Sequence, residues 1–308
     1  MSKLFKAAFY TGLISLAACT TVLDQSFIEA QAPGTIKRSF VEGNYGQAHV
    51  RVAKPQNNTS KKTPLVLLHP TPYSSQTYIP FIEAMRSDRL IIAIDTPGYG
   101  DSTGPETAPS MQDYADNALK VLEELGIHEP VDVIGYHTGT LIGVEMAIIA
   151  PDRVNKMVLA GVPVYAPHKL PELHKKYAKP DIIELDGSHL ISKWEFAKQT
   201  MKGGLSLEAA QDHFNDYMQS MPNSTQAYYT VFSYPGYERL PLISVPVLYV
   251  AIKGSLESET LEAHNLTPNS EYEYLEHITT GLFDVAYSDM AMTSQKFLDG
   301  TSDKQSAK

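Results

Sequence analysis

The chain has 308 residues, of which 43% are hydrophobic, and its formal net charge is -10 at pH 7. This length allows one large α/β domain or two smaller ones, and the apolar fraction is sufficient for a sizeable core. The acidic balance argues against a nucleic-acid partner, because phosphate binding requires a basic face. It also provides no electrostatic attraction to anionic lipid.

Residues 1–18 are expected to form a targeting segment. Lys3 and Lys6 give a positive start, and the apolar run over 7–18 is too short to cross a bilayer as a helix. The run ends in Leu-Ala-Ala-Cys, which resembles the lipobox of a bacterial lipoprotein and implies cleavage before Cys19 and lipidation of Cys19. Because Cys19 is the only cysteine, no intramolecular disulfide can form. The alternative is an ordinary secretory signal with an incidental cysteine.

The residues after Cys19 bear on localisation. Thr20 follows without an aspartate next to the cysteine, a pattern that in bacterial lipoproteins implies the outer membrane. We therefore expect a protein of the cell envelope that faces the periplasm, with lipid as an anchor and not as a span. Residues 19–34 are expected to be a polar tether, and residues 301–308 a polar tail.

The middle of the chain alternates between strand and helix patterns. Alternating polarity predicts an antiparallel hairpin over 35–41 and 47–52. Apolar runs predict further strands over 65–68, 90–94, 131–134, 156–161, 245–251 and 271–275. Helices are predicted over 111–125, 141–149 and 284–298, the first capped by Ser110 and Asp113. Strands separated by helices imply parallel βαβ units with right-handed crossovers.

This alternation breaks after Val162. No strand-like run occurs from 163 to about 241, and helices are predicted instead over 188–201, 206–218 and 225–232. The sequence therefore predicts a helical cap inserted at about 163–242 into an α/β domain that spans residues 35–300.

One short segment carries most of the functional information. Gly135-Tyr136-His137-Thr138-Gly139 lies between a predicted strand and a predicted helix. A strand, a tight turn and a helix, with small residues around one exposed side chain, is the layout of a nucleophile elbow. Glycines are expected there because side chains beside the strained central residue would clash. The usual central residue is a serine, and here it is His137.

Two further motifs make the resemblance specific. The segment 69–74 is similar to the His-Gly-x-Pro loop after the third strand of the α/β-hydrolase superfamily, and 95–102 matches the loop after the fourth. The resemblance implies an α/β-hydrolase fold, with a mostly parallel central sheet flanked by helices and a helical cap. It also implies that the backbone N–H groups of Thr71 and Thr138 form an oxyanion hole. Tyr136 resembles a residue that lines the acyl pocket.

The triad positions depart from the family pattern, whose order is nucleophile, acid, histidine. The loop after the strand at 245–251 contains no aspartate and offers only Glu257 as a weak candidate for the acid. Leu282 stands where the triad histidine is expected, and His277 is a weak candidate for a displaced base. With all three positions altered, a Ser–His–acid mechanism is not expected, because triad members act as a unit.

Four roles remain open for His137: general acid or base, ligand contact, nucleophile, or filler of the turn. His189 in the cap is a candidate pocket residue. We expect an atypical hydrolase or lyase acting on a small, partly apolar carbonyl or ester compound, with His137 as acid or base. The alternative is a membrane-anchored, non-catalytic binding protein that kept the pocket. We expect no cofactor, and no metal, because the histidines lack ligand spacing.

Overall fold

The computed structural model describes residue 28, residues 31–56 and residues 62–300. The predicted signal segment, Cys19, most of the predicted tether and the tail at 301–308 lie outside the described residues. In the described part, no helix is long and apolar enough to cross a membrane. Gln31 is buried and its amide donates to the Val52 carbonyl at 2.8 Å, so the end of the predicted tether packs against the domain.

The described strands form one eight-stranded sheet in the order β1-β2-β4-β3-β5-β6-β7-β8. Strand β2 is antiparallel to both of its neighbours, and all other neighbours are parallel. Every predicted strand is confirmed, with ends displaced by at most two residues. The bounds are β1 Ile36–Gly43, β2 Gly46–Ala53, β3 Leu65–Leu68, β4 Ile91–Ile94, β5 Val131–Tyr136, β6 Val154–Ala160, β7 Val247–Ile252 and β8 Ser270–Leu275.

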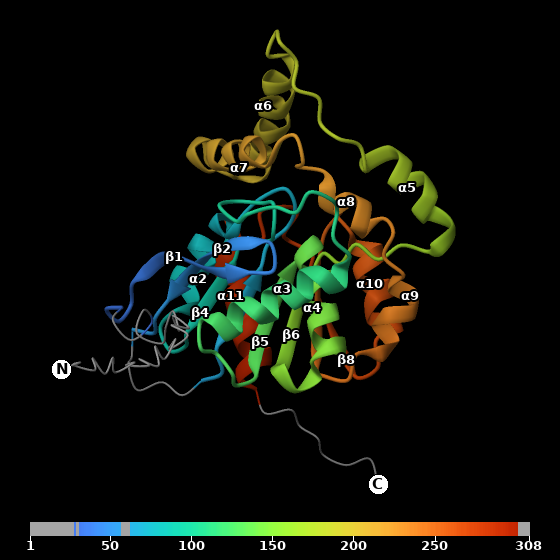
Figure 1. Cartoon of the computed structure of the whole chain (residues 1–308). Helices are drawn as coiled ribbons and strands as arrows, with labels where there is room; N and C mark the ends of the chain where they lie inside the picture. The colour runs from blue at the N-terminus through green and yellow to red at the C-terminus, as the bar shows by residue number, and fades with distance from the viewer. Residues whose placement is uncertain (1–27, 29–30, 57–61, 301–308) are drawn as a thin grey trace, which may run out of the picture.

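Helices cover both faces of this sheet (Figure 1). They are α2 Ile79–Met85, α3 Met111–Glu124, α4 Thr138–Ile149, α10 Glu257–Leu266 and α11 Tyr287–Asp299. The predicted cap of α3 is confirmed: Ser110 Oγ accepts from the Asp113 N–H at 3.1 Å, and the Asp113 carboxylate accepts from the Ser110 N–H at 2.8 Å. Helices α2 and α10 were not predicted, because α2 is only 7 residues long and α10 carries no apolar stripe.

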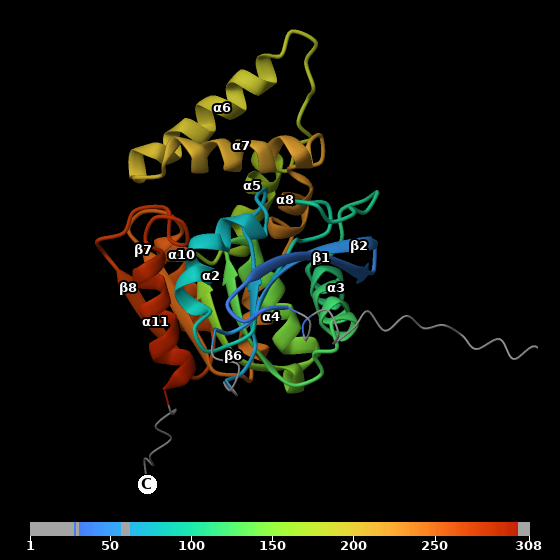
Figure 2. The same ribbon diagram turned by 90° about the vertical axis from the view of Figure 1, so that its left-hand side faces the viewer.

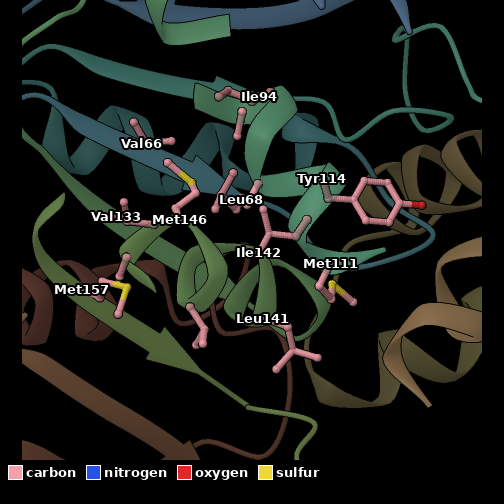
Figure 3. Packing of buried hydrophobic residues seen from close by; sticks show 14 of the residues in the cluster. Val66, Leu68, Ile94, Met111, Tyr114, Val133, Leu141, Ile142, Met146 and Met157 are labelled. Carbon is pink, nitrogen blue, oxygen red and sulfur yellow. The ribbon is translucent and has the colours of Figure 1, made fainter. Parts of the chain in front are cut away.

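Side chains alternate along the strands between two cores. Val66 and Leu68 of β3 belong to the core beneath α3 and α4, and Leu65 and Leu67 belong to the core beneath α2 and α11. Figure 3 shows the first core, in which Met146 and its neighbours on α4 lie against β3 and β5. A one-residue slip of β3 would exchange these two sets of side chains, so the packing fixes where the strand ends.

The cap lies above the carboxyl ends of the parallel strands (Figures 1 and 2). Its helices are α5 Leu170–Tyr177, α6 Ser188–Thr200, α7 Leu207–Ser220, α8 Gln226–Val231 and α9 Gly236–Arg239. The three helices predicted here are confirmed, and α5 and α9 are additional. Helix α5 has no fully buried residue, and Leu170 and Leu173 on one face of it are half-buried.

Candidate active site at the turn between β5 and α4

The predicted turn is present, and His137 is its central residue. The backbone of His137 has φ 48° and ψ -114°, a strained conformation for a residue with a side chain. A Cβ added to Gly139 would lie 1.9 Å from the Leu68 carbonyl oxygen, and one added to Gly135 would lie 2.5 Å from the Gly139 oxygen. Both glycines are therefore required by close backbone packing, which holds the strained turn in place.

The His137 ring is half-buried and contacts an aromatic neighbour. Its plane is perpendicular to that of Tyr136, with ring centroids 4.3 Å apart. A Cβ on Gly161 would lie 3.1 Å from His137 Nε2, so a glycine there leaves room for the imidazole. Neither ring nitrogen bonds any described residue, and burial lowers the pKa of His137 to about 4. The imidazole is therefore neutral at neutral pH.

Two cavities meet at this residue. The larger has a volume of about 600 Å³ and lies between the 70–73 loop and cap helices α5, α6, α7 and α8. The smaller has a volume of about 170 Å³ and extends toward the segment after β8. Tyr73, Tyr136 and His137 line both cavities. The elbow histidine thus borders two cavities, and one of them is large enough for a small organic ligand.

Of the two predicted oxyanion donors, Thr71 lines the larger cavity. Thr138 is the first residue of α4 and directly follows His137, which lines that cavity. Within the described part of the chain, neither backbone N–H donates a hydrogen bond. The carbonyl of Thr71 accepts from the Tyr228 hydroxyl at 3.3 Å, which ties this loop to the cap. Both amides are thus available to a ligand, one of them at a helix N-terminus.

Three other predicted residues lie away from His137. His277 is exposed over 61% of its side chain and pairs with Asp289 at 3.1 Å. Glu257 starts α10 and accepts from the Gly254 N–H, and His189 accepts from the Glu184 N–H at 3.1 Å. None of the three lines either cavity. The structure therefore does not bring these three predicted residues together with the elbow.

A histidine–carboxylate pair that sequence reasoning missed borders the smaller cavity. His213 of α7 lies with Nε2 3.1 Å from Asp284 Oδ2, and the two side chains are only 11% and 12% exposed. The ring of Tyr73 stacks on His213 with centroids 4.4 Å apart. Asp284 follows β8 in the segment where the family carries its triad histidine, which was the one available signal. His213 had none, because a cap helix gives no indication of what it covers.

Helix α7 is joined to the main domain beside this pair. The Asp216 carboxylate accepts from the Ser74 N–H at 3.0 Å and from the Ser74 hydroxyl at 2.8 Å. Burial raises the pKa of Asp216 to about 6, although the bonds from Ser74 oppose the shift. These bonds hold the helix that carries His213 against the loop that carries Thr71.

The outer wall of the larger cavity is charged. Lys193 Nζ lies 2.6 Å from Asp181 Oδ1 and 2.5 Å from the Tyr217 hydroxyl. Burial lowers the pKa of Lys193, but its bonds to Asp181 and Tyr217 raise it on balance. Lys176 and Lys179 line the same cavity, with Asp181 as the single carboxylate, so the wall is cationic in an acidic protein.

One grouping among the described residues has the spacing of metal ligands: His49, Asp95 and Asp101. Its atoms are engaged otherwise, because His49 Nδ1 lies 2.7 Å from Asp95 and Arg38 Nε lies 3.0 Å from His49 Nε2. Arg38 also pairs with Asp101. We therefore interpret the cluster as an ion-pair network that joins β1 and β2 to the loop after β4.

Fold and site together define a class of protein. A family model described as alpha/beta hydrolase fold matches residues 63–251, which is more than half of the chain. The chain therefore belongs to the alpha/beta hydrolase fold family, whose elbow here carries a histidine.

Individual relatives match shorter stretches. The (E)-2-((N-methylformamido)methylene)succinate hydrolase of Acinetobacter baylyi is 34% identical over 100 residues, or 32% of this chain and 38% of that protein. A Bacillus subtilis protein named uncharacterized carboxylesterase nap is 30% identical over 128 residues, or 41% of each chain. The chain thus spans about two fifths of the length of these curated relatives. The solved enol-lactonase of Burkholderia xenovorans LB400 aligns over 85% of this chain and all of its own, with a TM-score of 0.70 and 16% identity, which shows the fold alone.

Proposed function

We propose that this chain is an enzyme that acts on a small, partly apolar carbonyl or ester compound in the cavity beside His137, without a serine nucleophile. One observation carries the proposal: among the described residues, neither the backbone amide of Thr71, which lines the larger cavity, nor that of Thr138, which directly follows the cavity-lining His137, donates a hydrogen bond. Two such donors stabilise the negative oxygen that forms when a nucleophile adds to a carbonyl carbon. A side-chain change at the elbow leaves these backbone donors in place.

In this proposal His137 binds the reacting group as a neutral imidazole. A pKa of about 4 makes it a weak base at neutral pH, since a general base is most effective when its pKa lies near the working pH. A neutral imidazole still offers one N–H donor and one acceptor. This favours ligand contact over the acid–base role that the sequence alone favoured.

The cationic wall narrows the proposed substrate. Lys176, Lys179 and Lys193 against the single Asp181 favour a carbonyl compound that also carries a carboxylate. The Acinetobacter relative is named for a succinate derivative, and the solved neighbour for an enol-lactone. A hydrolase or a lyase for such a compound is consistent with the cavity volume of about 600 Å³.

A second function is favoured by a different observation. Among the described residues no carboxylate contacts His137, and the elbow has no serine, so the same cavity would also suit a binding protein that performs no chemistry. Such a protein would hold an anionic carbonyl compound through the same amides and lysines. Turnover separates the two functions, because binding alone releases the ligand unchanged.

Both functions are tested by assaying the full chain with p-nitrophenyl acetate, with aryl lactones and with their carboxylate-bearing analogues. We expect turnover that survives treatment with a fluorophosphonate, which labels serine nucleophiles. His137→Asn, a residue type that tolerates positive φ, is expected to lower the rate. Labelling of a serine would contradict the proposed mechanism, and saturable binding without turnover would favour the binding protein.

We also propose that Cys19 carries a lipid anchor, with the protein at the outer membrane facing the periplasm. The support is the apolar run that ends in Leu-Ala-Ala-Cys and the absence of any other cysteine in the sequence. Stable anchoring requires more than one acyl chain, which a lipidated amino-terminal cysteine would supply. Cell fractionation that recovers the chain only in the soluble fraction would contradict this proposal.

A further inference from the structure

The pair formed by His213 and Asp284 has the arrangement of an acid–base dyad. With the Nε2–H of a neutral His213 donated to Asp284, the lone pair of the ring lies on Nδ1. That Nδ1 atom is buried and has no hydrogen-bond partner among the described residues. A buried polar atom without a partner marks a position where a water molecule or a ligand is expected.

The pair formed by His213 and Asp284 shares a cavity with the elbow. His213 and Asp284 line the smaller cavity together with His137, and Tyr73, which lines both cavities, stacks on the His213 ring. The bonds between Asp216 and Ser74 fix the helix of His213 three residues further along. The imidazole is therefore held by a stacked ring, a carboxylate and an anchored helix.

We propose that His213, supplied by the cap and oriented by Asp284, is the general base of the reaction at the elbow. This inference rests on the proposed function and deepens it. His213 Nδ1 removes a proton from water, and the water oxygen forms a bond to the carbonyl carbon while the carbonyl π electrons move to the oxygen. The Thr71 and Thr138 amides stabilise this oxyanion. When the oxyanion collapses, the bond to the leaving oxygen breaks and the His213 imidazolium returns its proton to that oxygen.

His213 and Asp284 have different roles in this proposal. His213 contacts the reacting water and is catalytic, whereas Asp284 acts through His213 and is a positioning residue. The carboxylate follows β8, where relatives with a triad place the histidine, and the histidine has moved to the cap. A neutral His137 and a carboxylate-oriented His213 thus replace a single serine-centred triad.

The chain contains a matched control for this proposal. His277 and Asp289 form a pair with the same 3.1 Å separation, but their side chains are 61% and 41% exposed and line neither cavity. An exposed pair of this kind serves only as an ion pair, so its loss is not expected to affect catalysis. If His213 is the catalytic base, its replacement should lower kcat far more than replacement of His277.

The test compares the full chain with His213→Gln, Asp284→Asn and His277→Gln in p-nitrophenyl acetate hydrolysis over a pH series. His213→Gln is expected to lower kcat about a hundredfold or more with little change in KM, because general bases contribute that much. Asp284→Asn is expected to move the acidic limb of the pH–rate profile to lower pH, because the imidazolium loses its carboxylate. His277→Gln is expected to leave kcat unchanged.

Other titratable groups near His213 can also affect the pH–rate profile. They are Asp284, Asp216, Tyr73, Tyr136 and His137. Of these, Asp216 has a pKa that burial raises to about 6, and its bonds to Ser74 dock the cap. Asp216→Asn is therefore measured alongside. An acidic limb that moves with Asp216→Asn but not with Asp284→Asn overturns the proposal.

The results distinguish a failure of the base role of His213 from a failure of the proposed function. Wild-type turnover that His213→Gln leaves unchanged overturns the role of His213 and keeps the proposed function. No wild-type turnover of any ester or lactone in the panel overturns the proposed function, and the base role with it. Circular dichroism checks that each variant is folded. If His213→Gln does not fold, Asp284→Asn provides the test, and an unchanged acidic limb of its pH–rate profile overturns the proposal.

Discussion

The neutral state of His137 has a measurable consequence for stability. The pKa of His137 is about 4 in the native protein and 6.5 as the reference for the unfolded chain. The unfolded chain therefore binds a proton near pH 6.5, whereas the native protein resists it down to about pH 4. Stability contributed by the neutral imidazole is complete above the unfolded pKa and is lost as the pH falls toward the native one.

The size of this effect follows from the two values. At about pH 7.5 both states are neutral, and His137 makes no pH-dependent contribution. At about pH 4.5 the unfolded chain is almost fully protonated, and the native protein is mostly neutral. Linkage then gives a loss of about 2.5 kcal/mol from this one residue. This is a large share of the free energy of unfolding of a typical domain.

Urea unfolding followed by circular dichroism at these two pH values tests the reasoning. The free energy of unfolding of the wild-type chain is expected to fall by about 2.5 kcal/mol more than that of His137→Asn. His69, whose pKa burial also lowers, is present in both proteins and cancels in the difference. His277→Gln, at an exposed position, is expected to behave as wild type. Equal pH dependence in wild type and His137→Asn would mean that the elbow imidazole is not held neutral.

Four further predictions concern other parts of the chain. Gly139→Ala, whose Cβ would lie 1.9 Å from a carbonyl oxygen of β3, is expected to lower the free energy of thermal unfolding by about 3 kcal/mol. Gly143→Ala, whose Cβ would lie 3.2 Å from a methyl group of Val133, is expected to lower it much less. Asp216 is expected to have the opposite effect to His137, because its raised carboxyl pKa of about 6 increases the wild-type free energy of unfolding by about 2 kcal/mol from about pH 7.5 to 4.5. Asp216→Asn is expected to remove this increase. Lys193→Met is expected to raise KM for carboxylate-bearing esters but not for neutral ones, and equal changes for both would contradict the cationic wall as a specificity element. Mass spectrometry of the mature amino terminus is expected to find an acylated Cys19, and an unmodified start elsewhere would refute the anchor.

The fold was predictable because its determinants are local. Apolar runs and the capping pair Ser110 and Asp113 act within a few residues of where they stand. Helix α10 escaped prediction because its sequence carries no apolar stripe and tertiary contacts support it.

The site was predictable only in part, because some of its contacts join residues that are far apart in the sequence. The elbow and the loop carrying Thr71 are continuous motifs, so their approach follows from the strand order. The contact of His213 with Asp284 joins a cap helix to the segment after β8, and no periodicity records such a pairing. His277 was the nearest histidine in sequence to the expected position, but proximity along the chain did not bring it to the cavity.

A base supplied by the cap would make catalysis depend on cap position. In an enzyme whose triad lies wholly in the main domain, a cap that moves away exposes the site but leaves the reacting groups together. Here displacement of α7 would remove His213 from Asp284 and from the cavity that it shares with His137. The bonds between Asp216 and Ser74 would then stabilise both the closed cap and the assembled base. Ligand contacts with Lys193 and Tyr228 on the same cap would favour closure, so that the base is assembled when a ligand is bound.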